Sequence, residues 1–216
     1  MSATMEPVSA AIIVDVDESD RRAHAYRFFA ALLGRELVAG DVAILAGVPV
    51  APGPDDPPCP SGAAAEFSHA LGDIVAALPD RVDGEALGAL AAEYAHLFLG
   101  AGQAPAVPPY ESAYRGETRL YGTAAAEMRS LLHRWGLAAP RDMGPEDHIA
   151  VELTLMGVLA AREAASSDQR ALNARLLNWI PEFADRVKAS ARLPFYPAVA
   201  AALVAFLRAD QAHLPN

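Results

Sequence analysis

Two pairs of glutamate and histidine have the residue types and the spacing that metal binding would need. Glu93 and His96 form a Glu-x-x-His motif in a predicted helix, and His148 and Glu152 lie four residues apart in another. Di-iron helical bundles need two Glu-x-x-His motifs and two further glutamates. A structural role is therefore favoured, and a small helical metal-binding protein or metalloenzyme that uses these four residues is the alternative function.

The common signatures of catalysis are missing from the sequence. No His-Glu-x-x-His, Gly-x-Ser-x-Gly, P-loop or Gly-x-Gly-x-x-Gly motif occurs. Cys59 is the only cysteine, which excludes an internal disulfide and argues against a thiolate zinc site. Its proline and acidic neighbours disfavour a reactive thiolate. We therefore predict that the chain is not an enzyme and has no catalytic residue, metal ligand or bound cofactor of its own.

A second titratable cluster lies at a predicted helix start. Asp147 precedes His148, and His148 and Glu152 are i,i+4 neighbours beside an apolar stripe of Ile149, Leu153 and Met156. This spacing predicts charged groups at the rim of an apolar helix face. The structural interpretation is that Asp147 caps the helix while His148 tethers a neighbouring loop.

The segment from residue 108 to 112, Pro-Pro-Tyr-Glu-Ser, has two interpretations. It can be a rigid connector that its own tyrosine packs in place. It can also form a polyproline-like wall with an aromatic floor, which suits an extended peptide. Trp135 and Trp179 stand at helical spacing among apolar residues, and we expect both in the core.

Composition defines the kind of protein that must position these residues. The chain has 216 residues, of which 53% are hydrophobic and 7% aromatic, and alanine is abundant. Such a chain can bury a full core and favours helices. The net charge of −10 disfavours nucleic acid and anionic membranes as partners. No uncharged apolar run is long enough to span a bilayer and no signal peptide is recognisable, so we expect a cytoplasmic protein without an integral membrane segment.

The pattern along the chain predicts one all-helical domain. Residues 1–17 are expected to form a flexible arm and residues 18–216 a helical bundle. Helices are predicted over 18–40, 61–78, 85–99, 123–135, 145–160, 166–187 and 194–210, with Thr123 and Ser166 as caps and a kink or break at Pro181. Between the helices we expect a proline-rich surface loop over 48–61 and a functional loop over 100–117, because long ordered loops tend to be functional.

Three separated motifs resemble the TorD/DmsD/NarJ family of molybdoenzyme maturation chaperones, and its TorD/DmsD branch in particular. They are Tyr-Ala-His-Leu-Phe-Leu-Gly at 94–100, Pro-Pro-Tyr-Glu-Ser-Ala-Tyr at 108–114, and Glu-Asp-His at 146–148 with Glu152, Leu153 and Met156 behind it. The resemblance extends from about residue 23 to 210. It implies an all-α, single-domain helical bundle that acts as a non-enzymatic cytoplasmic chaperone.

The client implied by the resemblance is the catalytic subunit of a molybdopterin oxidoreductase. The chaperone would bind its twin-arginine signal peptide and apoprotein, aid cofactor insertion and prevent premature export. The molybdopterin cofactor would belong to the client. Two departures from the family pattern are Ala101, where proline is common, and Arg175, where many members have histidine. The resemblance leaves open whether the chain is a monomer or a helix-swapped dimer.

The motifs also carry over a set of peptide-binding residues. A twin-arginine leader joins a basic pair to an apolar segment, so its receptor needs an apolar groove with carboxylates at one end. The residues expected to form that surface are Leu97, Phe98, Pro108, Pro109, Tyr110, Glu111, Ser112, Tyr114, Gly122, Asp147, His148 and Glu152. A helical scaffold subunit without a peptide groove is the third possibility.

Overall fold

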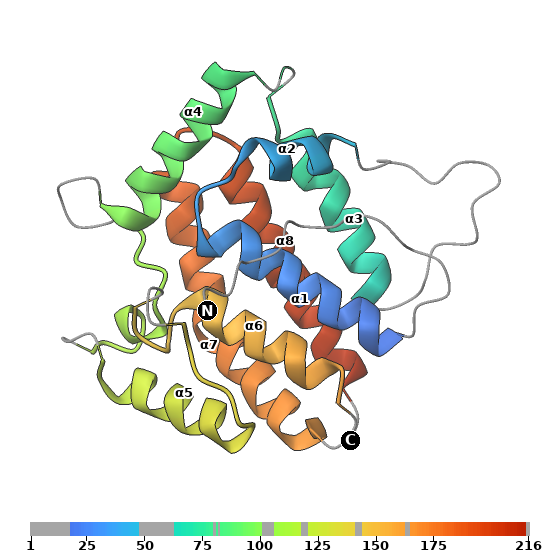
Figure 1. The fold of residues 1–216 in the computed structure, drawn as a ribbon, viewed down its shortest axis with the longest axis vertical. Coiled ribbons are helices and arrows are strands. Elements are labelled where there is room, and N and C mark those ends of the chain that lie inside the picture. The colour runs from blue at the N-terminus through green and yellow to red at the C-terminus, as the bar shows by residue number, and fades with distance from the viewer. Residues whose placement is uncertain are drawn as a thin grey trace.

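The regular structure of the described residues consists of eight α-helices, a π-helix over Ala95–Leu99 that continues α4, and a 3-10 helix over Glu111–Ala113, with no β-strand (Figure 1). The computed structural model describes residues 18–47, 63–79, 81, 83–100, 106–117, 121–140, 144–162 and 165–214. The helices are α1 (Glu18–Gly34), α2 (Ala39–Ala46), α3 (Ala63–Ala76), α4 (Gly84–Tyr94), α5 (Thr123–Arg134), α6 (Ile149–Ala160), α7 (Ser166–Ser190) and α8 (Phe195–His213). The predicted all-α class is confirmed, while the expected arm over 1–17 and the proline-rich loop over 48–61 lie outside the described residues.

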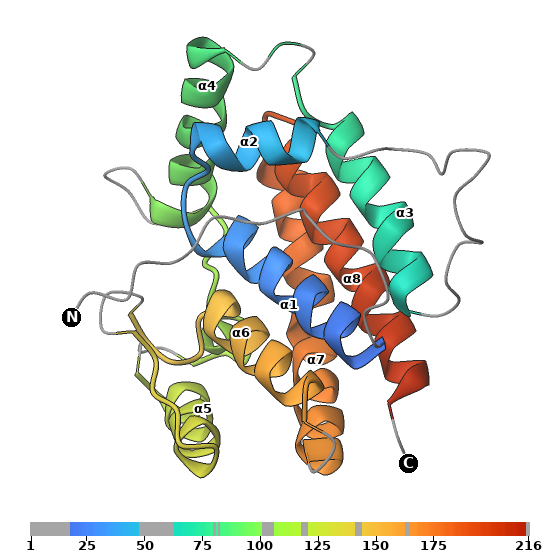
Figure 2. The same cartoon turned by 45° about the vertical axis from the view of Figure 1, so that its right-hand side comes forward.

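Helix α6 lies at the centre of the bundle. Its sequence is apolar on nearly every side, and a helix of that kind is stable only when it is buried. It packs along α1 on one side and against α7 on another, as both views show (Figures 1 and 2). Gly157 permits the close approach, because a Cβ atom there would lie 3.1 Å from the carbonyl oxygen of Ala23 in α1.

Helix α8 packs between α7 and α3 and completes the core. An aromatic cluster joins three helices at this point, with Phe67 of α3 within 6.1 Å of both Phe29 of α1 and Phe206 of α8 between ring centroids. Such edge-to-face contacts add stability beyond the apolar area they bury. Helix α5 lies apart from this cluster, at the far side of α6 and α7 (Figure 2).

A buried polar network also fastens α1 to α7 and α8. Arg22 forms an ion pair with Asp210, which is completely buried, and Tyr26 donates to the same carboxylate over 2.6 Å. Gln169 accepts from Arg22 over 3.0 Å, and Asn173 donates to the carbonyl of Leu207 over 3.1 Å. The network satisfies polar groups that would otherwise be costly to bury.

The predicted helix over 18–40 is wrong at its end. Helix α1 stops at Gly34, and α2 begins separately at Ala39. The helix ends because of an ion pair in the segment between α1 and α2, where Arg35 donates to both carboxylate oxygens of Asp41, over 2.6 and 2.9 Å. The same carboxylate accepts from the backbone N–H of Val38 over 3.0 Å and so starts the new helix.

Two predicted caps are also wrong, because the residues named as caps are the first residues inside their helices. Gly122 rather than Thr123 precedes α5, and the Glu117 carboxylate accepts from Ala124 N over 3.0 Å. Ser166 begins α7 without a side-chain cap. Helix α7 is continuous through Pro181, so the proline does not split it. None of the described helices combines the length and hydropathy needed to cross a membrane.

Candidate functional site

Two segments of the candidate site, far apart in sequence, meet side by side. The backbone around Tyr110 pairs with that around His148 as an isolated antiparallel bridge. Glu111 N donates to the Asp147 carbonyl over 3.0 Å, and Ile149 N donates to the Pro109 carbonyl over 2.9 Å. The structure therefore brings the proline-tyrosine loop and the start of α6 together, as one peptide-binding site would require.

The structural interpretation made Asp147 the helix cap and His148 the tether of the loop, and the structure exchanges these two roles. His148 is the N-cap of α6, and its Nδ1 accepts from Ala150 N over 3.1 Å, so the helix begins at Ile149 rather than at Pro145. Asp147 tethers the loop instead, because its carboxylate accepts from Ser112 N over 2.9 Å. Both side chains are buried, so the prediction that they stand at the rim of an apolar face is wrong.

Burial also determines the protonation of His148. It lowers the pKa of the imidazole to about 4, although the neighbouring Asp147 carboxylate acts in the opposite direction. The ring is consequently neutral at pH 7, which leaves Nδ1 free to accept the capping hydrogen bond. The Tyr110 ring contacts it edge-on, with centroids 5.0 Å apart.

A cluster of ion pairs lies next to this junction, between the loop, α5 and α7. Arg175 of α7 forms an ion pair with Glu111, a second with Glu127 over 3.0 Å, and lies 3.6 Å from Glu152. It also donates to the carbonyl of Ala124 over 2.8 Å. Arg175 thus joins the loop to α5, α6 and α7.

Arg115 brings a second guanidinium to the same carboxylates. It lies 2.6 Å from Glu127, 3.7 Å from Glu111 and 3.9 Å from Glu117, all between nitrogen and oxygen atoms. Burial raises the pKa of Glu111 despite the two arginines, whereas the hydrogen bond from Arg115 lowers the pKa of Glu127. With Glu152, whose pKa burial raises, four carboxyl groups surround two guanidinium groups.

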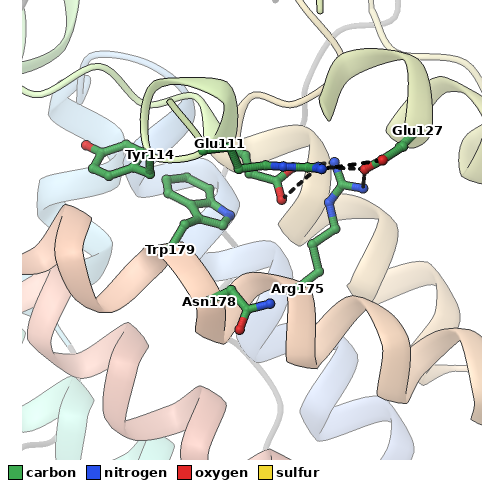
Figure 3. Close-up of a pocket in the computed structure, with 7 residues that line it drawn as sticks. Glu111, Tyr114, Glu127, Arg175, Asn178 and Trp179 are labelled. Atoms are coloured by element: carbon green, nitrogen blue, oxygen red, sulfur yellow. Dashed lines mark hydrogen bonds and ion pairs between the residues drawn. The ribbon is translucent and has the colours of Figure 1, made fainter. Parts of the chain in front are cut away.

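The ion cluster borders a pocket of about 360 Å³. Its aromatic side is formed by Tyr114 and Trp179, whose rings lie 5.2 Å apart, and Trp179 Nε1 donates to Glu152 over 3.1 Å. Figure 3 shows Arg175 reaching toward Glu111 and Glu127, with the rings of Tyr114 and Trp179 on the other side of Glu111. The lining residues are Glu111, Tyr114, Arg115, Glu127, Arg175, Asn178 and Trp179. The pocket can accommodate a planar cation between carboxylates and an aromatic wall.

The predicted site residues are dispersed over the loop, the junction and the core. Glu111 and Tyr114 line the pocket, and Pro108, Tyr110 and Gly122 are partly exposed. The buried members are Leu97, Phe98, Pro109, Glu111, Ser112, Asp147, His148 and Glu152. Phe98 stacks on Phe183 at 5.9 Å, and Leu97 is fully buried. Both belong to the core in this conformation, and their contact with a peptide stays a prediction.

The sequence reasoning missed most of the residues that complete the pocket. Arg115 and Glu127 lie in no recognisable motif, and the only signal for their role is that Arg115 stands four residues after Glu111. Arg175 was noted only because it departs from the family pattern, and not as part of a site. Trp179 is buried as predicted, whereas Trp135 is partly exposed and donates to Asp168 over 2.8 Å.

The four residues of the metal alternative are used for structural contacts. Glu93 accepts from the backbone N–H groups of Arg192 and Leu193 and so holds the turn between α7 and α8. His96 Nε2 lies 3.3 Å from the carbonyl oxygen of Ser190. A second Glu-x-x-His, formed by residues 66 and 69 on α3, has an exposed histidine. Within the described ranges no three His, Cys, Asp or Glu side chains are grouped as metal ligands, so the structure gives this alternative no support.

Known proteins resemble the chain over most of its length. It is 34% identical to the chaperone protein TorD of Photobacterium profundum over 218 residues, which covers 91% of this chain and 95% of that protein. TorD of Aeromonas salmonicida is 33% identical over 213 residues, or 91% of this chain and 92% of that protein. The chain belongs to the TorD family of chaperones. A profile of the family described as nitrate reductase delta subunit also matches residues 62–185.

The solved structures agree with the fold of this TorD-family chain. A structure described as a redox enzyme maturation protein from Archaeoglobus fulgidus superposes with a TM-score of 0.54 at 22% identity, covering 93% of this chain and 99% of that one. Because the relatives in the TorD family are chaperones, the predictions of family and of a non-enzymatic chaperone are confirmed.

Proposed function

We propose that this chain is a cytoplasmic chaperone for a molybdopterin oxidoreductase. It binds the client's twin-arginine signal peptide and apoprotein, aids insertion of the molybdopterin cofactor into the client and prevents premature export. Membership of the TorD family supports the client class. The observation that carries peptide binding is the pocket in which Glu111 and Glu127 hold guanidinium groups beside Tyr114 and Trp179.

The chemistry of this pocket matches the basic half of such a leader. A guanidinium is planar and offers a fork of donors to a carboxylate, and its face stacks on aromatic rings. Arg186 already lies over the Tyr114 ring, with 4.7 Å between the guanidinium carbon and the ring centroid. The pocket therefore contains both kinds of partner that an arginine side chain uses.

Calorimetric titration with synthetic leaders tests the proposal. Three peptides share an apolar run and differ in the preceding pair, which is Arg-Arg, Lys-Lys or Ala-Ala. Partly exposed ion pairs contribute about 0.2–1 kcal/mol each, so replacing both arginines with alanine should weaken binding roughly 2- to 30-fold, more at low salt. Lys-Lys should fall between, because an ammonium lacks the planar fork. Equal affinity for the Arg-Arg and Ala-Ala peptides would contradict the proposal.

A further inference from the structure

Two adjoining hollows lie between α5 and α7. The first is the ion pocket described above, and the second has a volume of about 430 Å³. They share Glu127 and Arg175 as lining residues. The second is lined further by Ser130, Leu131, Arg134, Asp168, Ala171 and Leu172. We call the two hollows together the α5–α7 groove. It has the carboxylates at one end, and at the other it has Leu131 and Ala171 beside the ion pair of Arg134 and Asp168.

The two arginines of the groove are held very differently. Arg175 is 17% exposed and contacts three carboxylates as well as the carbonyl of Ala124, so it is part of the framework. The Arg115 side chain also reaches three carboxylates, but it comes from the loop after Glu111–Ala113 and is 37% exposed. Its two hydrogen bonds, over 2.6 and 3.4 Å, both go to Glu127, which is 45% exposed. Ion pairs with that much solvent contact exchange at little cost.

The carboxylates retain capacity for a further cation. Glu111, Glu117, Glu127 and Glu152 outnumber Arg115 and Arg175 by two. Oε1 of Glu152 is fully buried without a hydrogen-bond partner, 3.6 Å from a similarly unpaired Nε of Arg175. The other oxygen of Glu152 accepts from Trp179 Nε1, so Oε1 is the acceptor on this carboxyl group that a further cationic donor would satisfy.

We propose that Arg115 occupies the place of a client arginine and that the α5–α7 groove is the seat of the leader peptide. On binding, an arginine of the peptide replaces Arg115 at Glu127 and Glu111. The apolar residues that follow it in the leader then cover Leu131 and Ala171. This inference rests on the proposed function, and charge complementarity and the apolar end of the groove select this occupant over a second copy of the chain.

The test removes the internal competitor. Arg115→Gln should bind the Arg-Arg peptide about three- to tenfold more tightly than the wild type, and its preference over the Ala-Ala peptide should increase. The matched control is Arg129→Gln, on α5, because Arg129 is 45% exposed and pairs with Glu146 over 2.6 Å away from the groove. The control changes the net charge equally and should leave the affinity within about twofold of wild type.

The apolar end has its own pair of variants. Ala171 and Ala174 are both exposed on α7, but only Ala171 lines the groove. Ala171→Gln should weaken the Arg-Arg peptide about threefold or more, since the longer polar side chain fills the apolar hollow. Ala174→Gln should have no effect. Both positions accept glutamine as a good helix former, so folding should be unchanged.

The outcomes separate this inference from the proposed function. In one outcome the wild type prefers the Arg-Arg peptide over the Ala-Ala peptide, and Arg115→Gln and Arg129→Gln both bind the Arg-Arg peptide with wild-type affinity. The groove assignment is then overturned and the proposed function stands. If both arginine variants gain affinity equally, net charge explains the gain and the displacement of Arg115 is overturned. If neither wild type nor Arg115→Gln distinguishes Arg-Arg from Ala-Ala, or if neither binds, both inferences are refuted.

Discussion

His148 should make the protein acid-sensitive, and a single substitution can isolate the effect. Its buried imidazole is neutral in the folded chain because burial lowers its pKa to about 4. In the unfolded chain the pKa returns to about 6.5. Between these values the unfolded state binds more protons than the folded state, so the free energy of unfolding must fall as the pH falls.

The two pKa values determine the size of this loss. At pH 7 both states are largely neutral, and the histidine has little effect. At pH 5 the unfolded imidazole is almost fully protonated while the folded one is mostly neutral, which lowers the free energy of unfolding by about 2 kcal/mol relative to pH 7. The neighbouring Asp147 carboxylate is already part of the balance that gives the folded value.

The informative variant is His148→Asn, because asparagine is a good N-cap and does not titrate. Urea denaturation at pH 7 and pH 5 gives the pH-dependent loss for each protein. Wild type should lose about 2 kcal/mol more than the variant, since the effects of other titrating groups are common to both. A loss of the same size in both proteins would show that His148 is accessible to protons in the folded state, and the reasoning would fail.

Two further predictions concern the loop and the helix contacts. Tyr110→Ala and Asp147→Asn should both chiefly lower the melting temperature, because the Tyr110 ring packs against His148 and the Asp147 carboxylate holds Ser112 N. Neither residue lines the α5–α7 groove, so a roughly tenfold loss of leader affinity in either variant would contradict the groove assignment. Gly157→Ala should destabilise the chain by about 1–3 kcal/mol despite its better helix propensity, because the new Cβ meets the α1 backbone. Gly88 lies on α4, and a Cβ atom added there would have no neighbour within 4 Å. Gly88→Ala should therefore raise the free energy of unfolding by about 0.5–1 kcal/mol, and thermal melting of both glycine variants measures the two effects.

Helices were predictable wherever the local pattern also determines the packing. The apolar residues of α6 and α8 follow helical spacing and are buried, so sequence and core agree. The boundary after α1 was not predictable, because it depends on the Arg35 pair with Asp41, a contact that a periodic pattern does not encode. Glu117 caps α5 for a similar reason, from outside the helix.

The candidate site was predictable in part. The resemblance pointed to the loop around Tyr110 and to Asp147 and His148, and the structure places these segments together. It could not show that Asp147 and His148 are buried, since exposure depends on the surrounding helices. The cluster around Arg175 was hidden because four separate segments contribute to it, and none carries a motif for an ion pair.

The arginine clusters around Arg22 and Arg175 differ in a way that bears on function. Arg22 and Asp210 are enclosed, share Tyr26 and Gln169, and hold α1 against α7 and α8. Buried ion pairs contribute little net stability, but removing one partner is costly, so this network chiefly fixes how the helices pack. The Arg175 cluster also connects elements, yet it opens to a pocket and has more carboxylates than guanidiniums. An unbalanced cluster exposed to solvent is poorly suited to stabilise a core, and it is well suited to receive a cation from another chain.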